Sequence, residues 1–226
     1  MEFITTVLRF FQNGGPFMYP IALVLVVGVA VALERWLYLT HAKSANRKAF
    51  QQLMPLLKKR DYAGVMKLGQ TSNAPIARII SAGVARMSQS QRRDDIELAM
   101  EEGVMEAMPR LEERTPYLAT LANIATLLGL LGTIIGLIAA FTAVADADPA
   151  EKANLLSASI SVAMNTTAFG LMSAIPLLLF HATLQTKTTE IIDSLEMAGV
   201  KCLNLMGVGT AQRASGKPGS EPSAQA

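Results

Sequence analysis

Two long runs without a charged side chain constrain this chain more than any other feature. Residues 115–145 and residues 153–186 contain no Asp, Glu, Lys or Arg. A helix rises about 1.5 Å per residue, so each run is longer than the roughly 30 Å hydrocarbon layer of a bilayer. Both runs are therefore predicted to be transmembrane helices.

A third uncharged run predicts another membrane helix near the N-terminus. Residues 16–33 carry no charge, and Trp36 and Tyr38 lie just beyond them. Pro16 suits the start of a helix, and Trp and Tyr favour the membrane interface. The alternative is a cleaved signal peptide, but the apolar run starts late and no small-x-small cleavage site follows it. We predict an uncleaved first span over residues 16–40.

The distribution of charge predicts the orientation. Thirteen of the 20 Lys and Arg residues fall between Lys43 and Arg114, whereas residues 146–152 hold three acids and one Lys. By the positive-inside tendency, residues 41–114 are cytoplasmic and residues 146–152 form a periplasmic loop. The N-terminus is then periplasmic and the C-terminus cytoplasmic. The net charge of +2 gives no reason to expect nucleic acid as a partner.

The remaining segments complete an all-α membrane protein, with three transmembrane helices and long cytoplasmic helical extensions. Residues 1–15 fit a short amphipathic helix at the periplasmic interface. Residues 187–208 continue the third span as a cytoplasmic helix. Residues 209–226 are polar and rich in Gly, Pro and Ser, so we expect a disordered tail.

The cytoplasmic segment has helical patterns and no strand signal. Asp61 is expected to cap a helix that stops at Gly69, and Pro75 to open another. Asp94 or Asp95 is expected to cap a third helix, which continues into the second span. The apolar residues expected on this third helix are Ile96, Leu98, Met100, Val104, Met105 and Met108. About seventy residues make a marginal independent core, so a solvated connector and an assembly surface both stay open.

Polar side chains in the two long spans are the candidates for function. One face of the second span is small and hydroxyl-bearing, and it carries Thr126, Gly129, Thr133, Gly136 and Ala140. The third span carries polar residues at steps of four and then two threonines, namely Ser157, Ser161, Asn165, Thr166 and Thr167. A threonine in a membrane helix often bonds a carbonyl of its own helix, which gives each one a structural alternative.

Asn165 is harder to explain structurally, because an unsatisfied amide in hydrocarbon costs several kcal/mol. It must face protein, water or a ligand. Hydroxyl and carbonyl oxygens suit a hard cation or a water chain that relays protons. An ion pathway along Thr126, Thr133 and the group at 165–167 is therefore predicted.

Other residues have structural interpretations. Gly129, Gly132 and Gly136 form a helix-packing surface, and Pro176 is expected to kink the third span or leave a carbonyl free. His181 fits an interfacial role, and the single Cys202 cannot form an internal disulfide. The hypothesis of a hydrolase that uses Ser173 and His181 is weak. The two residues are about 12 Å apart along one helix, too far for a hydrogen bond between them. No metal-ligand cluster or phosphate-binding loop suggests an enzyme.

Two stretches carry a resemblance to a known family. Residues 121–137, LANIATLLGLLGTIIGL, resemble the second-span signature of the ExbB/TolQ/MotA ion-channel family, and residues 166–176, TTAFGLMSAIP, look like its third-span signature. Their order, spacing and topology agree with that family over nearly the whole chain apart from the tail.

The resemblance implies a subunit of an inner-membrane motor. Family members form a homo-oligomeric ring, typically a pentamer, around the membrane helices of a dimeric, single-span partner like ExbD or TolR. That partner supplies a protonatable intramembrane Asp, and a TonB-like or TolA-like protein acts further along. The chain would thus use the proton motive force to energise an envelope process such as TonB-dependent transport.

The resemblance also assigns residues. The family's second-span Thr falls on Thr133 and its third-span Thr on Thr167, whereas Val162 stands where ExbB and TolQ members usually carry Glu. This departure leaves the identity of the transported ion open between H⁺ and Na⁺. Na⁺ would be coordinated near Thr133, Thr166 and Thr167. A passive membrane scaffold and a channel without a mechanical partner also remain alternatives.

Overall fold

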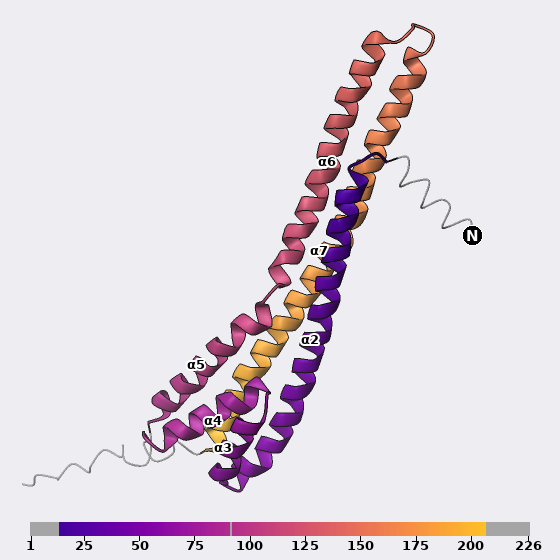
Figure 1. Ribbon diagram of the computed structural model, residues 1–226. Helices are drawn as coiled ribbons and strands as arrows, with labels where there is room; N and C mark the ends of the chain where they lie inside the picture. The colour runs from indigo at the N-terminus through magenta and orange to yellow at the C-terminus, as the bar shows by residue number, and fades with distance from the viewer. Residues whose placement is uncertain (1–13, 91, 207–226) are drawn as a thin grey trace, which may run out of the picture. The chain divides into compact units, whose positions relative to one another are not determined.

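The computed structural model describes residues 14–90 and 92–206, and within these ranges the chain is helical and contains no strand. The helices are α2 (Met18–Lys58), α3 (Tyr62–Thr71), α4 (Pro75–Met87), α5 (Arg93–Glu112), α6 (Thr115–Asp146) and α7 (Lys152–Leu205), as drawn in Figure 1. The expectation of an all-α chain is confirmed. Most of the interfacial helix expected at 1–15 and all of the tail expected at 209–226 lie outside the described residues.

Among the described residues, three helical stretches are long and apolar enough to cross a membrane, namely Met18–Lys58, Arg93–Ala145 and Lys152–Leu205. Only 22%, 22% and 33% of the most apolar window in each stretch is buried inside the chain. Apolar side chains in contact with water are costly, so most of this surface requires lipid or another chain. These three stretches therefore fit a multi-pass membrane protein.

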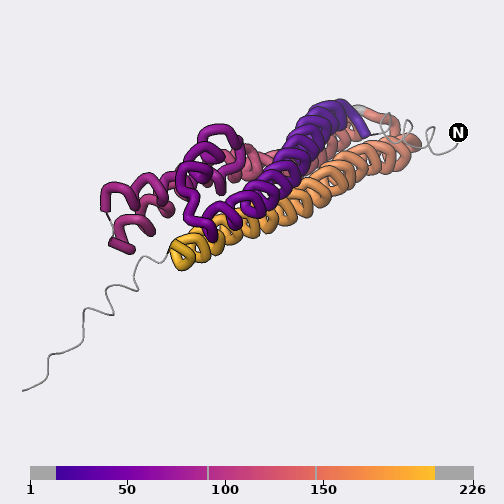
Figure 2. Tube along the Cα trace, turned by 90° about the horizontal axis from the view of Figure 1, so that it is seen from below, coloured from indigo at the N-terminus to yellow at the C-terminus, as the bar shows by residue number. Residues whose placement is uncertain are grey.

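The first of two compact units consists of α2 up to Tyr38 together with Glu112–Lys187. Within it, α6 and the first part of α7 run side by side in opposite directions, and the start of α2 lies along α7 (Figures 1 and 2). Gly28 permits this approach, because an added Cβ would lie 2.6 Å from the Cδ2 atom of Leu177. α7 continues through Pro176, whose missing N–H leaves one carbonyl of the preceding turn without its helical donor.

The second unit consists of Leu39–Leu111 and the described residues from Thr188 onwards. Apolar side chains from five helices fill its core, including Leu53, Val65, Ile76, Ile80, Ile96 and Leu195. The N-cap of α4 is Ala74, which has no capping side chain, but the Oδ1 atom of Asn46 accepts a hydrogen bond of 3.2 Å from the Ile76 N–H. This buried bond from α2 satisfies an N–H group that the helix itself leaves free.

One local expectation in this unit is confirmed and another is corrected. Asp61 does cap α3, accepting a 2.9 Å hydrogen bond from the Gly64 N–H, but α3 ends at Thr71 and not at Gly69. Gly69 is a packing residue, since a Cβ there would lie 3.1 Å from the Ala77 carbonyl oxygen. Its lack of a side chain lets α3 pack against α4 without ending the helix.

Two expectations for the next helix, its capping residue and its continuation into the second span, are also wrong. α5 begins at Arg93, so Asp94 and Asp95 lie inside its first turn, where carboxylates suit the positive end of the helix dipole. Leu98 and Met105 are exposed, whereas Ile96, Met100 and Val104 are buried. α5 does not run into α6, because Arg114 adopts a left-handed conformation at φ 63° between the two helices.

Candidate functional site

α6 and α7 approach each other most closely at two glycines. A Cβ added at Gly170 would lie 2.8 Å from the Ala125 carbonyl oxygen and 3.0 Å from the Gly129 Cα. A Cβ added at Gly129 would lie 3.2 Å from the Gly170 Cα. Since these neighbours are main-chain atoms, which cannot rotate away, only glycine fits at either position without a shift of the helices.

The predicted packing glycines of α6 all lie against α7. Beyond Gly129, the Thr166 side chain occupies the space next to Gly132, and the Ala163 Cβ lies 3.0 Å from a Cβ built at Gly136. Gly170, the partner of Gly129, was not singled out from the sequence. The signal that would have found it is the spacing of small residues at Ala163, Thr167, Gly170 and Ala174 along α7.

Thr167 joins the two helices by a hydrogen bond. Its Oγ1 donates to the Gly129 carbonyl oxygen on α6 at 2.9 Å, and the side chain is half-buried. Gly129 has no side chain to cover its carbonyl, which explains why a residue on α7 can reach it. The two helices are therefore joined by a hydrogen bond at the place where the two glycines meet.

Thr133 lies one turn beyond Gly129 on the same face of α6. Its hydroxyl donates to the Leu130 carbonyl oxygen at 2.6 Å, and its side chain is half-buried. A hydroxyl that donates to its own helix keeps lone pairs free to accept. Thr133 and Thr167 thus place two hydroxyl oxygens on successive carbonyls of α6, Thr133 on that of Leu130 and Thr167 on that of Gly129.

Thr166 is directed to a different neighbour. Its Oγ1 lies 2.6 Å from the Gly14 carbonyl oxygen and 3.0 Å from that of Val162, and the residue is only 2% exposed. Its single proton is donated to one of these carbonyls, while Thr167 donates to Gly129. The two adjacent threonines, predicted as one group, therefore bind different segments of the first unit.

The other residues predicted for the pathway, Asn165 and Thr126, are more exposed than Thr166. Asn165 is half-buried. Thr126 is exposed on the surface of α6, where its hydroxyl donates to the Ala122 carbonyl oxygen at 3.1 Å. Thr126 thus has the own-helix bond expected of a structural threonine, and its lone pairs face outward. A neighbouring chain or lipid would complete its surroundings.

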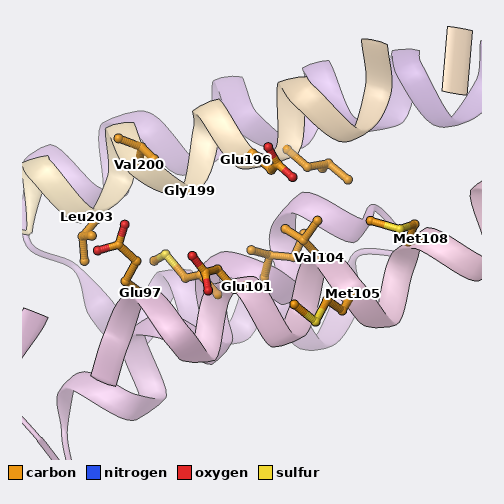
Figure 3. Close-up of a pocket in the computed structure, with 12 residues that line it drawn as sticks. Glu97, Glu101, Val104, Met105, Met108, Glu196, Gly199, Val200 and Leu203 are labelled. Carbon is orange, nitrogen blue, oxygen red and sulfur yellow. The ribbon is translucent and has the colours of Figure 1, made fainter. Parts of the chain in front are cut away.

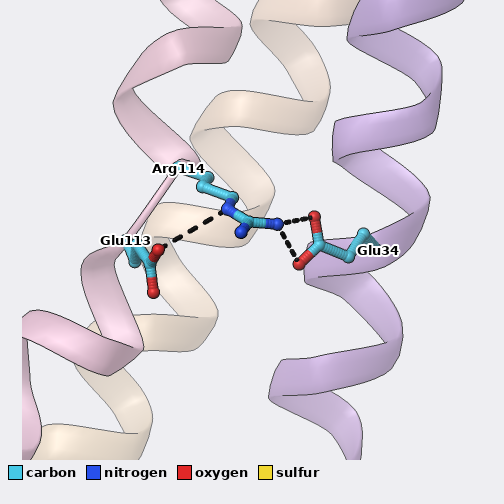
Figure 4. Close-up of polar contacts among 3 residues, drawn as sticks. All are labelled: Glu34, Glu113 and Arg114. Atoms are coloured by element: carbon cyan, nitrogen blue, oxygen red, sulfur yellow. Dashed lines mark hydrogen bonds and ion pairs between the residues drawn. The ribbon is translucent and has the colours of Figure 1, made fainter.

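Charged residues of the first unit lie just outside the three uncharged runs, and sequence reasoning missed the contacts between them. Figure 4 shows Arg114, whose Nη1 donates to both carboxylate oxygens of Glu34, at 2.8 and 2.7 Å. Its Nε also lies 3.5 Å from Glu113 Oε1. The hydrogen bond that Arg114 donates to Glu34, together with the charges of the Glu34 and Glu113 carboxylates, raises the pKa of Arg114 above its ordinary value. In the same unit, Lys187 Nζ lies 3.1 Å from the ring centroid of Trp36, a cation–π contact.

A family model described as the MotA/TolQ/ExbB proton channel family matches residues 71–197. This range covers more than half of the chain and includes α4, α5, α6 and the greater part of α7. The chain belongs to the MotA/TolQ/ExbB proton channel family. The resemblance drawn from the two span signatures is confirmed.

Individual relatives agree with this assignment. A putative biopolymer transport protein ExbB homolog of Methanothermobacter thermautotrophicus is 31% identical over 203 residues, covering 87% of this chain and 69% of that protein. A putative ExbB-like protein of Synechocystis is 27% identical, over 74% of this chain and 79% of its own. The Tol-Pal system protein TolQ of Pseudomonas aeruginosa is 26% identical, over 76% of this chain and 81% of its own.

Val162, where the resemblance leads one to expect Glu, lies beside the start of α2. Val162 is half-buried, and its Cγ1 atom is 3.2 Å from a Cβ built at Gly15. Gly15 has a φ of +73°, a conformation that favours glycine. A longer side chain at position 162 would therefore meet the turn that precedes α2.

Three further residues have defined surroundings. Ser173 is fully buried, and its hydroxyl has no hydrogen-bond partner among the described residues. His181 is half-buried on the same helix, eight residues further on. Cys202 is buried in the second unit, and this burial raises the pKa of its thiol to about 12. A thiol with such a pKa stays neutral and unreactive at physiological pH.

Proposed function

We propose that this family member is a ring-forming subunit of an inner-membrane proton channel that moves a single-span partner of the ExbD/TolR kind. The membership of the proton channel family and the relatives named as biopolymer transport and Tol-Pal proteins support the class. The observation that carries the mechanism is the pair Thr133 and Thr167, whose hydroxyls donate to the adjacent carbonyls of Leu130 and Gly129 within two runs that hold no charged side chain.

The chemistry follows from what the two spans lack. Neither residues 115–145 nor residues 153–186 contain an acid, so these two spans offer no carboxylate to bind and release a proton. A carboxylate at the bilayer centre costs about 2.5–3.5 kcal/mol on insertion scales. Hydroxyl and carbonyl oxygens of this chain would solvate a partner's Asp, lowering that cost and setting its proton affinity.

The ring and its partner follow from the exposed apolar surface of the spans. Most of the apolar window in each spanning stretch is unburied within one chain, which supports packing against further copies and a central helix pair. Each proton that crosses 100 mV yields about 2.3 kcal/mol, so work on the partner requires repeated transfers. A pentamer around a dimer, and a TonB-like or TolA-like protein beyond it, belong to the same proposal.

The ion proposed is H⁺, and one contact favours it over Na⁺. A Na⁺ site at Thr133, Thr166 and Thr167 needs all three hydroxyl oxygens on one centre, but the Thr166 hydroxyl lies against the Gly14 carbonyl. A proton relay requires only that successive oxygens come within reach, directly or through water. Proton transport therefore demands less rearrangement of this site.

Mild purification of the complex from native membranes, followed by native mass spectrometry, tests this proposal. The expected result is a ring of this chain that holds a single-span protein with an Asp in its membrane segment. Proton flux in vesicles should then be lost in Thr133→Val and retained in Thr142→Val, a matched threonine of α6 that bonds only its own helix. A ring that conducts alone would favour a stand-alone channel, and normal flux in Thr133→Val would favour a scaffold.

A further inference from the structure

A groove in the second unit has no part in the proton pathway. It lies between α5 and α7, with Ile79 of α4 at its base, and its volume is about 440 Å³. That volume falls within the range of sites that hold several side chains of a ligand. Figure 3 shows side chains of α5 and α7 facing each other across it.

The walls of the groove are apolar and adaptable. Met100, Met105 and Met108 contribute thioethers from α5, and Val200 contributes from α7. Met105 is 64% exposed and Val200 is 48% exposed, although both are apolar. Methionine adjusts its shape to an incoming apolar surface, which is why it recurs in grooves that bind helices.

The rim of the groove is acidic. Glu97 and Glu101 stand on α5 and Glu196 stands on α7 (Figure 3). Arg93 is the basic group beside them, and its Nε lies 4.0 Å from Glu97 Oε2. Exposed carboxylates around an apolar floor attract a segment that is both basic and apolar.

The α7 wall of the groove leaves space for an added side chain. Gly199 lies on the α7 wall, and the nearest atom to a Cβ built there is the Met100 Sδ at 3.9 Å. This is ordinary van der Waals contact, so a methyl group fits without a shift. A larger side chain at position 199 would occupy the groove itself.

We propose that this groove binds a short basic, amphipathic helix formed by the cytoplasmic segment of the single-span partner. The inference rests on the proposed function, in which residues 41–114 are cytoplasmic and the partner crosses the membrane once. The positive-inside tendency makes the cytoplasmic flank of such a span rich in Lys and Arg. Its basic face pairs with the three carboxylates, and its apolar face covers Met105 and Val200.

Site-specific photocrosslinking in the native membrane tests the occupant. A benzoylphenylalanine at Met105 or at Val200 should crosslink to the cytoplasmic segment of the co-purifying single-span protein, as mapped by mass spectrometry. The matched control is Met197, which is 59% exposed on α7 but does not line the groove. Crosslinks to a second copy of this chain, to lipid alone, or in equal yield at Met197 would overturn the proposal.

Charge variants supply the second measurement. Glu97→Gln, Glu101→Gln and Glu196→Gln together should lower the crosslink yield by about tenfold, because they remove the attraction for the basic face. Glu102→Gln with Glu106→Gln, exposed residues of α5 outside the groove, should leave the yield unchanged. An equal yield in both sets would count against the groove.

The two proposals fail in distinguishable ways. If a single-span protein co-purifies but its cytoplasmic segment crosslinks elsewhere, the groove assignment is wrong and the proposed function stands. If no single-span protein co-purifies, both are overturned.

Discussion

The hydroxyl of Thr167 on α7 donates a hydrogen bond of 2.9 Å to the main-chain carbonyl oxygen of Gly129 on α6. The same two helices make main-chain contact at Gly129 and Gly170. The residue proposed to line the ion pathway is therefore also part of the helix packing. Variants at these positions have to separate the two roles.

Thr167→Val should abolish proton flux while the ring still assembles. The substitution keeps the shape of the side chain and removes one interhelical hydrogen bond, which in membrane proteins is worth about 0.6 kcal/mol on average. Flux in vesicles loaded with a pH-sensitive dye, and the native mass of the complex, measure the two properties. Thr167→Ser keeps the hydroxyl and should retain flux, whereas wild-type flux in Thr167→Val would remove Thr167 from the pathway.

Gly170→Ala should destabilise the chain by about 1–3 kcal/mol, as overpacking does at sites without room. The new Cβ would lie 2.8 Å from the Ala125 carbonyl oxygen, so the helices must separate. The thermal midpoint in detergent reports the loss. Gly199→Ala is the matched control, since its Cβ meets nothing nearer than 3.9 Å, and an equal effect of both variants would contradict the packing argument.

Arg114→Gly should be more stable than Arg114→Ala. Both lose the bonds to Glu34, but only glycine adopts a φ of 63° without strain. Thermal midpoints of the two variants and of wild type separate the backbone contribution from the ion pair. The raised pKa keeps Arg114 charged, and the ion pair intact, up to strongly alkaline pH.

Exchanging Val162 for Glu should make the proposed proton transport depend more strongly on pH. The new carboxyl group would stand beside the turn at Gly15, one helical turn from Thr166, and would add an ionisable group to the path. Transport at fixed membrane potential, measured against pH and Na⁺ concentration, checks this. Val162→Gln is the neutral control of similar size, and an unchanged dependence in the Glu variant would refute the assignment.

Cys202 should resist alkylation in the folded protein and react once the chain unfolds. Burial raises the pKa of its thiol from 9.0 to about 12, so the reactive thiolate is scarce at pH 8. The unfolded state releases this proton first, so the cysteine's contribution to stability falls as pH rises between 9.0 and about 12. Mass spectrometry after N-ethylmaleimide treatment measures the reaction. The control is Met197→Cys in a Cys202→Ala background, which should label rapidly.

Patterns within single helices gave the sequence analysis its correct results. Pro75 opens α4, and Ile76, Ile79, Ile80 and Val84 are all buried on one side of it, as the spacing predicts. Asp61 caps α3 for the same local reason. These features depend only on residues within a turn or two of each other.

Features that join distant segments were missed. Glu34 and Arg114 are 80 residues apart, and no periodicity relates them. Gly170 matters because α6 approaches it, and the side that α6 takes is decided by packing in three dimensions. Thr166 and Thr167 were expected to act as one group. Successive residues of a helix point about 100° apart, so the two threonines contact different neighbours.

The contact between Thr166 and Gly14 has a practical consequence for tagging. Gly14 lies just ahead of α2, and its carbonyl accepts a hydrogen bond from Thr166, the neighbour of Thr167 on α7. A fluorescent protein fused ahead of Gly14 would be tethered within a short reach of Thr166 and would pull on the contact. A reporter fused after Met206 follows the end of α7 and spares it, so imaging and pull-down reagents belong at the C-terminus.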